Sequence, residues 1–215
     1  MKKMKILLVE DQEENRRAAQ QYFTQKDHVH VEYAIDYNQA VEKLNKELYD
    51  GIITDIFMPQ ETGTNERRLG IEAYKKIYFK IYDDFEREAA KEEGSYFIHT
   101  IDHVLNCCYE LKEKLFEGNN NQPLGVLIAE KAEELGIPCV IATSLFHHHV
   151  MAEPVFYYVY HSDSLKKCKI YEGEIVTDGS GRNLKTTQEY WDEVYTALLS
   201  RIKEEKGEAE HNAMK

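Results

Sequence analysis

Short apolar runs alternate with amphipathic stretches over the first 55 residues. The runs at 5–9, 29–34 and 51–54 are rich in aliphatic and β-branched residues and too short for helices, so they predict strands. Between them, residues 13–25 and 37–47 place apolar and small side chains at helical spacing among charged ones. Strands that alternate with helices over short links predict parallel pairing, so we expect the start of a doubly wound α/β sheet.

This alternation is interrupted after Pro59. A long charged and tyrosine-rich stretch with helical character runs from about 69 to 116, which predicts a mostly helical insert over residues 60–122. The apolar pattern then resumes, because 124–135 predicts a helix that ends before a glycine and 138–143 (PCVIAT) predicts a fourth buried strand.

The last third is less regular. Residues 144–151 predict a short helix, and 155–160 (VFYYVY) predict a fifth strand because aromatic and β-branched residues favour strands. Alternation and turn residues over 161–184 predict a hairpin or loop elaboration. Residues 187–202 predict a final core-facing helix, and the charged tail, 204–215, is expected to be flexible.

Size and charge narrow the classes of protein. The 215 residues fit one domain with an insert, and we expect a single domain over 1–203. A formal net charge of -12 disfavours nucleic acid and anionic membranes as partners. No apolar run reaches membrane-spanning length and no signal-peptide pattern begins the sequence, so a cytoplasmic location is expected. The four cysteines show no CxxC spacing, which favours reduced thiols.

Acidic side chains stand at the ends of two predicted strands. Glu10 and Asp11 follow the first strand, and Asp55 follows the third. The carboxyl ends of parallel strands meet at one edge of the sheet, so three carboxylates should gather there. Such a cluster requires a proton or a hard cation, and Mg²⁺ is the usual ion. A carboxylate in that position can serve as a nucleophile that accepts a phosphoryl group.

The segments ILLVEDQEEN, YDGIITDIFMP and IPCVIATS resemble the receiver domain of bacterial response regulators. The resemblance implies a flavodoxin-like five-stranded sheet of order 2-1-3-4-5. It also implies roles for individual residues. Glu10 and Asp11 match the metal-binding pair, Asp55 the phosphoacceptor, Thr143 the hydroxyl that follows the phosphoryl group, and Phe57 the position whose backbone carbonyl binds the metal.

The lysine of the family's site is harder to assign. Receivers carry a Lys-Pro pair at the end of the fifth strand, whereas VFYYVY here runs into His161. Lys185 is the preferred candidate, since it precedes the final helix as the family's lysine does. The pair Lys166 and Lys167 is the alternative.

The leading hypothesis is a stand-alone receiver that takes a phosphoryl group on Asp55 from a histidine kinase or phosphotransfer protein, with Mg²⁺ as cofactor. Its output would be binding to a downstream protein or to a second copy of the chain. The alternative is a degenerate, phosphorylation-independent interaction module that uses the helical insert. A phosphatase-like enzyme is disfavoured, because Phe57 stands where a second aspartate would act as general acid.

Two groups of histidines fall outside this site. His99 and His103 lie four residues apart with Cys107 one turn further, a spacing that suits zinc but is also typical of a mixed helix face. The run His147–His149 directly follows the predicted fourth strand, where it could contact phosphate, bind metal or sense pH, although loop histidines without chemistry are the simpler interpretation.

Overall fold

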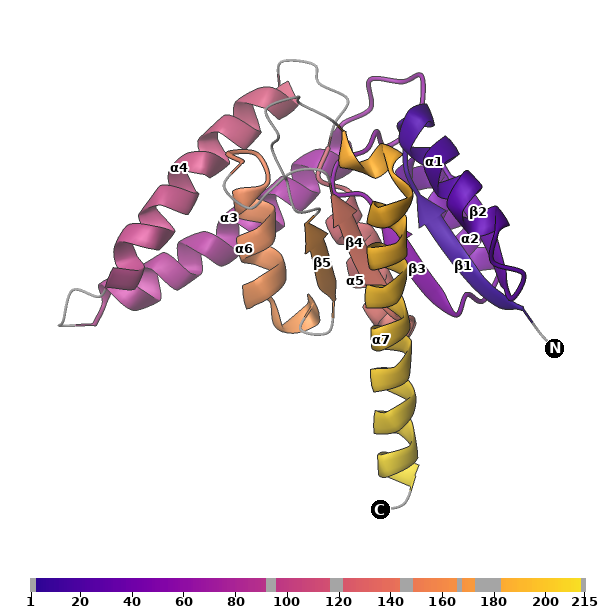
Figure 1. Cartoon of the computed structure of the whole chain (residues 1–215). Helices are drawn as coiled ribbons and strands as arrows, with labels where there is room; N and C mark the ends of the chain where they lie inside the picture. The colour runs from indigo at the N-terminus through magenta and orange to yellow at the C-terminus, as the bar shows by residue number, and fades with distance from the viewer. Residues whose placement is uncertain are drawn as a thin grey trace.

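A five-stranded, all-parallel sheet of order β2-β1-β3-β4-β5 forms the centre of the computed structural model (Figure 1). This is the flavodoxin-like order that the resemblance implied. The structure describes residues 3–91, 96–116, 122–143, 149–165, 168–172 and 183–213. The strands are β1 (Met4–Val9), β2 (Val29–Ala34), β3 (Gly51–Thr54), β4 (Cys139–Thr143) and β5 (Lys169–Glu172).

The strand register places the ends of β1 and β3, which the acidic residues follow, next to each other. Val9 pairs with Thr54, and Thr54 pairs with Ile141. Because every strand runs in the same direction, the residues that follow Val9 and Thr54 emerge at one edge of the sheet. That edge is where Glu10 and Asp55 begin their loops.

Helices cover both faces of this sheet, because the apolar side chains of buried parallel strands point alternately to the two faces. Side chains of one parity, including Ile6, Leu8 and Ile53, pack against α1 and α7, whereas Leu7 and Ile52 face the other layer. That second layer contains α2, α5, α6 and the insert. The helices are α1 (Glu13–Thr24), α2 (Tyr37–Lys46), α3 (Arg68–Ala89), α4 (Tyr96–Phe116), α5 (Gly125–Glu134), α6 (Glu153–His161) and α7 (Gln188–Ala213), with 3-10 turns η1 (Asp163–Leu165) and η2 (Leu184–Thr186).

The insert between β3 and α5 consists of two long helices, α3 and α4, that lie side by side and extend away from the sheet (Figure 1). The stretch from 69 to 116, for which helical structure was expected, contains the helices α3 and α4. Ile77, Ile81 and Ile101 of these helices are fully buried and belong to the same hydrophobic cluster as the second face of the sheet. The insert thus shares its core with the α/β unit.

The prediction of a strand at 155–160 is wrong, because this segment is part of α6. Pro154 lies in the first helical turn, which suits its fixed φ angle. The six residues from 154 to 159 are all buried, since α6 packs against both α3 and α4 of the insert. A helix that is apolar on every side has no helical periodicity, so its aromatic run resembled a strand.

The fifth strand comes from the segment in which a hairpin was expected. β5 (Lys169–Glu172) pairs in parallel with β4, and Thr143 is aligned with Glu172. Residues 173–182 of the expected hairpin, and residues 144–148 of the expected short helix, lie outside the described residues. Polar and apolar residues alternate in the segment around this strand (KIYE) and turn residues follow it, so the sequence pattern favoured a hairpin over a single parallel strand.

The C-terminal helix is longer than the sequence pattern predicted. α7 continues to Ala213, where a flexible tail was expected from residue 204. Glu204 pairs with Arg201 and with Lys169, and Glu205 also pairs with Arg201. These contacts at helical spacing support the helix beyond the sheet. Within the described part of the chain, no helix is long and apolar enough to cross a membrane.

Candidate functional site

Three carboxylates meet at the carboxyl edge of the sheet. Glu10 and Asp11 follow β1, and Asp55 follows β3. The backbone N–H of Asp55 donates to the carbonyl of Val9 over 3.0 Å, which fixes the two loops against each other. One carboxylate oxygen from each of the three residues lies within 4.8 Å of the others. The sequence-based expectation of a clustered acid triad is thus matched by the geometry.

Lys185 reaches this cluster from the 3-10 turn η2, just before α7. Its Nζ lies 2.9 Å from Oε2 of Glu10 and 2.9 Å from Oδ2 of Asp55. Lys185 and Glu10 are each only 1% exposed, so both charges are withdrawn from water. We refer to Glu10, Asp11, Asp55 and Lys185 together as the acid site.

The backbone around Lys185 is held from two sides. Its N–H donates to Oδ1 of Asn183, and its carbonyl accepts the indole N–H of Trp191 over 2.7 Å. Asn183 also donates to Oδ1 of Asn15 in α1. The ammonium position is therefore set by α1 and α7, both on the same face of the sheet.

Burial and like charge govern the pKa values of the acids. Burial, together with the carboxylates of Glu10 and Asp11, raises the pKa of Asp55 to about 7, although Lys185 opposes this shift. Burial and Glu10 raise the pKa of Asp11 to about 6. Burial alone would lower the pKa of Lys185, but Asp55 and Glu10 outweigh it and hold that pKa above its ordinary value.

The donor set suits a hard divalent cation. Oδ1 of Asp11 is buried and has no hydrogen-bond partner, a costly arrangement that a bound cation would relieve. Three ionised carboxylates and one ammonium sum to a charge of about -2, which matches one Mg²⁺. The residues present therefore fit the metal that the resemblance implied.

Further contacts at this edge come from residues that sequence reasoning missed. Asn15 in the first turn of α1 donates to Oε1 of Glu10 over 3.1 Å, and the N–H of Gln12 donates to the same oxygen. The Arg16 guanidinium donates to the carbonyls of Glu10 and Asp11. These residues lie one to five positions after the acidic pair, and no motif marks them, because their role depends on where α1 begins.

The loop after Asp55 is closely supported. Oδ1 of Asp55 accepts the N–H of Ile56 over 2.7 Å, and the Ile56 carbonyl accepts the N–H of Gly125 at the start of α5. A β-carbon on Gly125 would lie 1.9 Å from the Asp55 carbonyl oxygen, so only glycine permits this approach. Phe57, the predicted carbonyl ligand, follows in the same loop and is buried.

The next residue of that loop connects the acid site to the insert. Met58 and Gln122 exchange backbone hydrogen bonds of 3.0 and 3.1 Å, so the two ends of the insert meet beside the acid site. The Gln122 side chain accepts from the N–H of Gly70 and donates to the Glu66 carbonyl. The first turn of α3 is thereby fixed to the loop that carries Asp55.

Thr143, the predicted hydroxyl residue, is the last residue of β4 and lies at the same edge of the sheet. Its backbone carbonyl accepts the hydroxyl of Tyr190, a buried residue of α7. Burial raises the pKa of Tyr190 well above its ordinary value, which keeps the hydroxyl a donor. Tyr190 was predicted neither as a site residue nor as a neighbour of Thr143.

The structure brings Glu10, Asp11, Asp55 and Lys185 into contact range and places Thr143 at the same edge. The alternative lysines, Lys166 and Lys167, lie outside the described residues, as do His147 and His148.

Comparison with known proteins gives one match. The family model for the response regulator receiver domain matches residues 6–69, from β1 to the start of α3. No curated protein and no solved structure matches the chain. The matched segment contains both acidic motifs, and the sheet extends the same fold through β4 and β5. Residues 6–69 therefore match a response-regulator receiver domain, and the chain has the flavodoxin-like sheet order with a long helical insert after its third strand.

Proposed function

We propose that this protein is a response-regulator receiver that accepts a phosphoryl group on Asp55 with the aid of Mg²⁺. Receiver domains generally accept a phosphoryl group on an aspartate, and residues 6–69 match that family. The observation that carries the proposal is the position of Asp55, which shares Lys185 with Glu10 and has a carboxylate oxygen within 4.8 Å of one from Asp11. We further propose that residues 1–203 form one domain, with 60–122 as its insert.

The reaction would be a direct displacement at phosphorus. A carboxylate oxygen of Asp55 forms a bond to phosphorus while the bond from phosphorus to the donor's leaving oxygen or nitrogen breaks, and the electron pair leaves with the donor. Glu10, Asp11 and Asp55, with the Phe57 carbonyl, would hold the metal. When bound, Mg²⁺ supplies positive charge that offsets the carboxylates and the phosphoryl oxygens.

Lys185 would bind and orient the phosphoryl group. Its ammonium bridges Glu10 and Asp55 before the reaction, and it can pair with a phosphoryl oxygen once Asp55 is esterified. Thr143 would provide a hydroxyl to the same group. Because Tyr190 contacts the Thr143 backbone, a movement of Thr143 would reach α7.

The phosphoryl donor would be a histidine kinase or a phosphotransfer protein, the partners with which receiver domains generally interact. Output would proceed through a protein surface, either on a downstream partner or on a second copy of the chain. The Met58–Gln122 contact supports a role for the insert, because it joins the loop of Asp55 to α3.

Acetyl phosphate provides a direct test. The full-length protein is incubated with Mg²⁺ and acetyl phosphate, and its intact mass is measured. We expect the mass of one phosphoryl group to be added to the wild type and to the control Asp83→Asn, which changes an exposed aspartate on α3. The Asp55→Asn variant should gain none. An unmodified wild type, or a modified Asp55→Asn, would contradict the proposal.

An interaction module that works without phosphorylation is the second candidate. Its support is a set of aromatic side chains that the insert leaves in solvent: Phe79 is 58% exposed, Tyr82 41% and Tyr109 54%. Exposed aromatic residues are enriched at protein interfaces. If a partner is found, equal affinity for wild type and Asp55→Asn, with and without beryllofluoride, would favour this candidate. Tighter binding of the beryllofluoride-treated wild type would favour the phosphoacceptor.

A further inference from the structure

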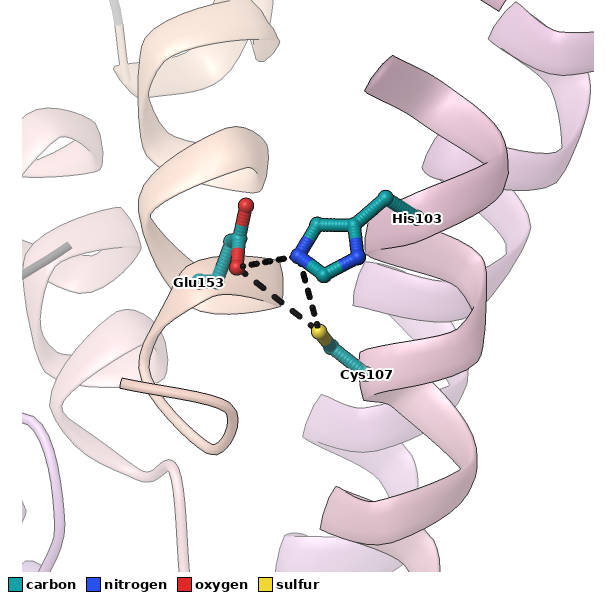
Figure 2. Close-up of side chains that lie close together, drawn as sticks. All are labelled: His103, Cys107 and Glu153. Atoms are coloured by element: carbon teal, nitrogen blue, oxygen red, sulfur yellow. Dashed lines mark hydrogen bonds and ion pairs between the residues drawn. The ribbon is translucent and has the colours of Figure 1, made fainter. Parts of the chain in front are cut away.

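A second cluster of metal-binding side chains joins the insert to α6 (Figure 2). His103 and Cys107 project from α4, and Glu153 projects toward them from α6. Nε2 of His103 lies 3.2 Å from Oε2 of Glu153, and Sγ of Cys107 lies 3.8 Å from that nitrogen and 3.7 Å from that oxygen. We call these three residues the insert cluster.

These separations fit the edges of a tetrahedral zinc site. Zn²⁺ binds sulfur at about 2.3 Å and nitrogen or oxygen at about 2.0–2.2 Å, so tetrahedral ligands lie about 3.4 to 3.6 Å apart. The three measured separations, 3.2, 3.7 and 3.8 Å, are each within a few tenths of an ångström of those values. An ion could therefore bind with only small side-chain adjustments.

The local structure fixes all three donors. His103 and Cys107 are four residues apart, so they lie on the same face of α4, one turn from each other. Glu153 lies in the first turn of α6, where its N–H and that of Ala152 both donate to the carbonyl of His149. The donors thus come from two packed helices, and Glu153 lies 46 positions after Cys107 in the sequence.

Burial differs among the three donors in a way that suits metal entry. Cys107 is 3% exposed, while the side chains of Glu153 and His103 are 18% and 63% exposed. An ion can therefore enter from the His103 side, and water can complete its coordination. The combination of thiolate, imidazole and carboxylate favours zinc over magnesium, which prefers oxygen ligands alone.

We propose that His103, Cys107 and Glu153 bind Zn²⁺ and that the ion links the insert helix α4 to α6. On binding, the Cys107 thiol loses its proton to solvent and sulfur bonds to the metal. The link matters for the fold because α6 follows β4, the strand that ends at Thr143. The proposal is independent of phosphorylation at Asp55, since it uses none of the residues of the acid site.

Cobalt provides a spectroscopic test, because a cobalt–thiolate bond gives an ultraviolet charge-transfer band that carboxylates do not. The full-length protein is titrated with Co²⁺ in excess Mg²⁺, which occupies oxygen-only sites, and the bound Co²⁺ is then displaced with Zn²⁺. The variants are Cys107→Ala and His103→Ala. Their matched controls are Cys108→Ala, a neighbouring buried thiol, and His99→Ala, an exposed histidine one turn earlier on α4.

We expect the band in the wild type and in both controls, and its loss on addition of Zn²⁺. Cys107→Ala should show no band, and His103→Ala should bind Co²⁺ at least about tenfold more weakly. Zn²⁺ should raise the melting temperature of the wild type but not that of Cys107→Ala. Absence of the band from folded wild type, or equal affinity in His103→Ala and His99→Ala, would overturn the proposal.

Discussion

The acid site and the insert cluster each gather three metal-binding side chains, but they balance charge in different ways. The acid site contains its own cation, because Lys185 lies 2.9 Å from both Glu10 and Asp55 in the protein interior. The insert cluster contains one carboxylate, a thiol and an imidazole. Buried carboxylates need a nearby positive charge even when no metal is bound. A weakly charged group of side chains at a contact between helices does not. Under the two proposals, the acid site would exchange Mg²⁺ and a phosphoryl group, whereas the insert cluster would hold two helices together.

The largest expected effect is that phosphorylation at Asp55 and metal binding by the insert cluster can each be abolished without loss of the other. Asp55→Asn should abolish phosphorylation by acetyl phosphate and leave the cobalt–thiolate band unchanged, because Asp55 belongs to the acid site and is not one of the three residues of the insert cluster. Cys107→Ala should do the reverse, with phosphorylation retained and the band lost. Intact mass and ultraviolet absorption measured on the same samples test both. If either variant lost both signals while remaining folded, the two regions would not be independent.

Removing the Lys185 ammonium should lower the free energy of unfolding more than the other substitutions proposed below. Lys185→Met leaves Glu10 and Asp55 buried without their partner, so we expect the free energy of unfolding without metal to fall by about 3–5 kcal/mol. Urea denaturation measures this. The control Lys169→Met breaks an exposed pair with Glu204 and should cost well under about 1 kcal/mol. Mg²⁺ should stabilise Lys185→Met more than wild type, and equal stability of the two proteins without metal would contradict this account.

A smaller effect should follow from crowding the loop after Asp55. In Gly125→Ala the new methyl group would meet the Asp55 carbonyl at 1.9 Å, and backbone atoms must move to accept it. We expect a loss of about 1–3 kcal/mol in unfolding free energy and slower phosphorylation. Gly207→Ala is the matched control, because nothing lies within 4 Å of a β-carbon there. It should be neutral or stabilising by up to about 1 kcal/mol. Identical behaviour of the two variants would contradict the close approach.

The smallest effect concerns Glu32, whose pKa is lowered by neighbouring lysines, whereas neighbouring carboxylates raise the pKa of Asp55 in the acid site. Lys5, with Lys43 and Tyr49, lowers the pKa of Glu32 to about 2. The unfolded pKa is about 4.3, so the stabilisation is complete above about pH 5 and disappears as the pH falls toward 2. Glu32→Gln should therefore be less stable than wild type by about 1 kcal/mol at pH 7. Chemical denaturation at both ends of this pH range should show that the difference in unfolding free energy between wild type and Glu32→Gln becomes smaller at low pH. A difference independent of pH would exclude the lowered pKa of Glu32 as its cause.

The sequence predicted β1, β2 and β3 and the helices α1 and α2 to within a residue or two of their bounds. Short continuous apolar runs mark the buried strands β1 and β3, alternation marks β2, and helical periodicity marks α1 and α2. The pattern failed at α6, where every side is buried, and at β5, whose alternating residues and following turn residues favoured a hairpin. In both places tertiary packing, rather than local pattern, determines the structure.

The candidate site shows a similar division. Glu10, Asp11 and Asp55 could be predicted because each follows directly on a recognisable strand, and sheet geometry does the rest. The residues that hold Lys185, namely Asn183 and Trp191, depend on how η2 packs against α1 and α7. Glu153 was not part of the predicted zinc spacing of His99, His103 and Cys107, since it lay between an expected helix at 144–151 and an expected strand at 155–160. A contact between two helices so far apart in sequence leaves no local signal.

The central claim is that Asp55 accepts a phosphoryl group, and chemical mapping tests it most directly. After incubation with acetyl phosphate and Mg²⁺, borohydride reduction converts an aspartyl phosphate to homoserine, and peptide mass spectrometry locates the change. We predict homoserine at position 55 alone, dependent on Mg²⁺ and absent from Asp55→Asn. Reduction at another carboxylate, or none in wild-type protein that binds Mg²⁺, would contradict the claim.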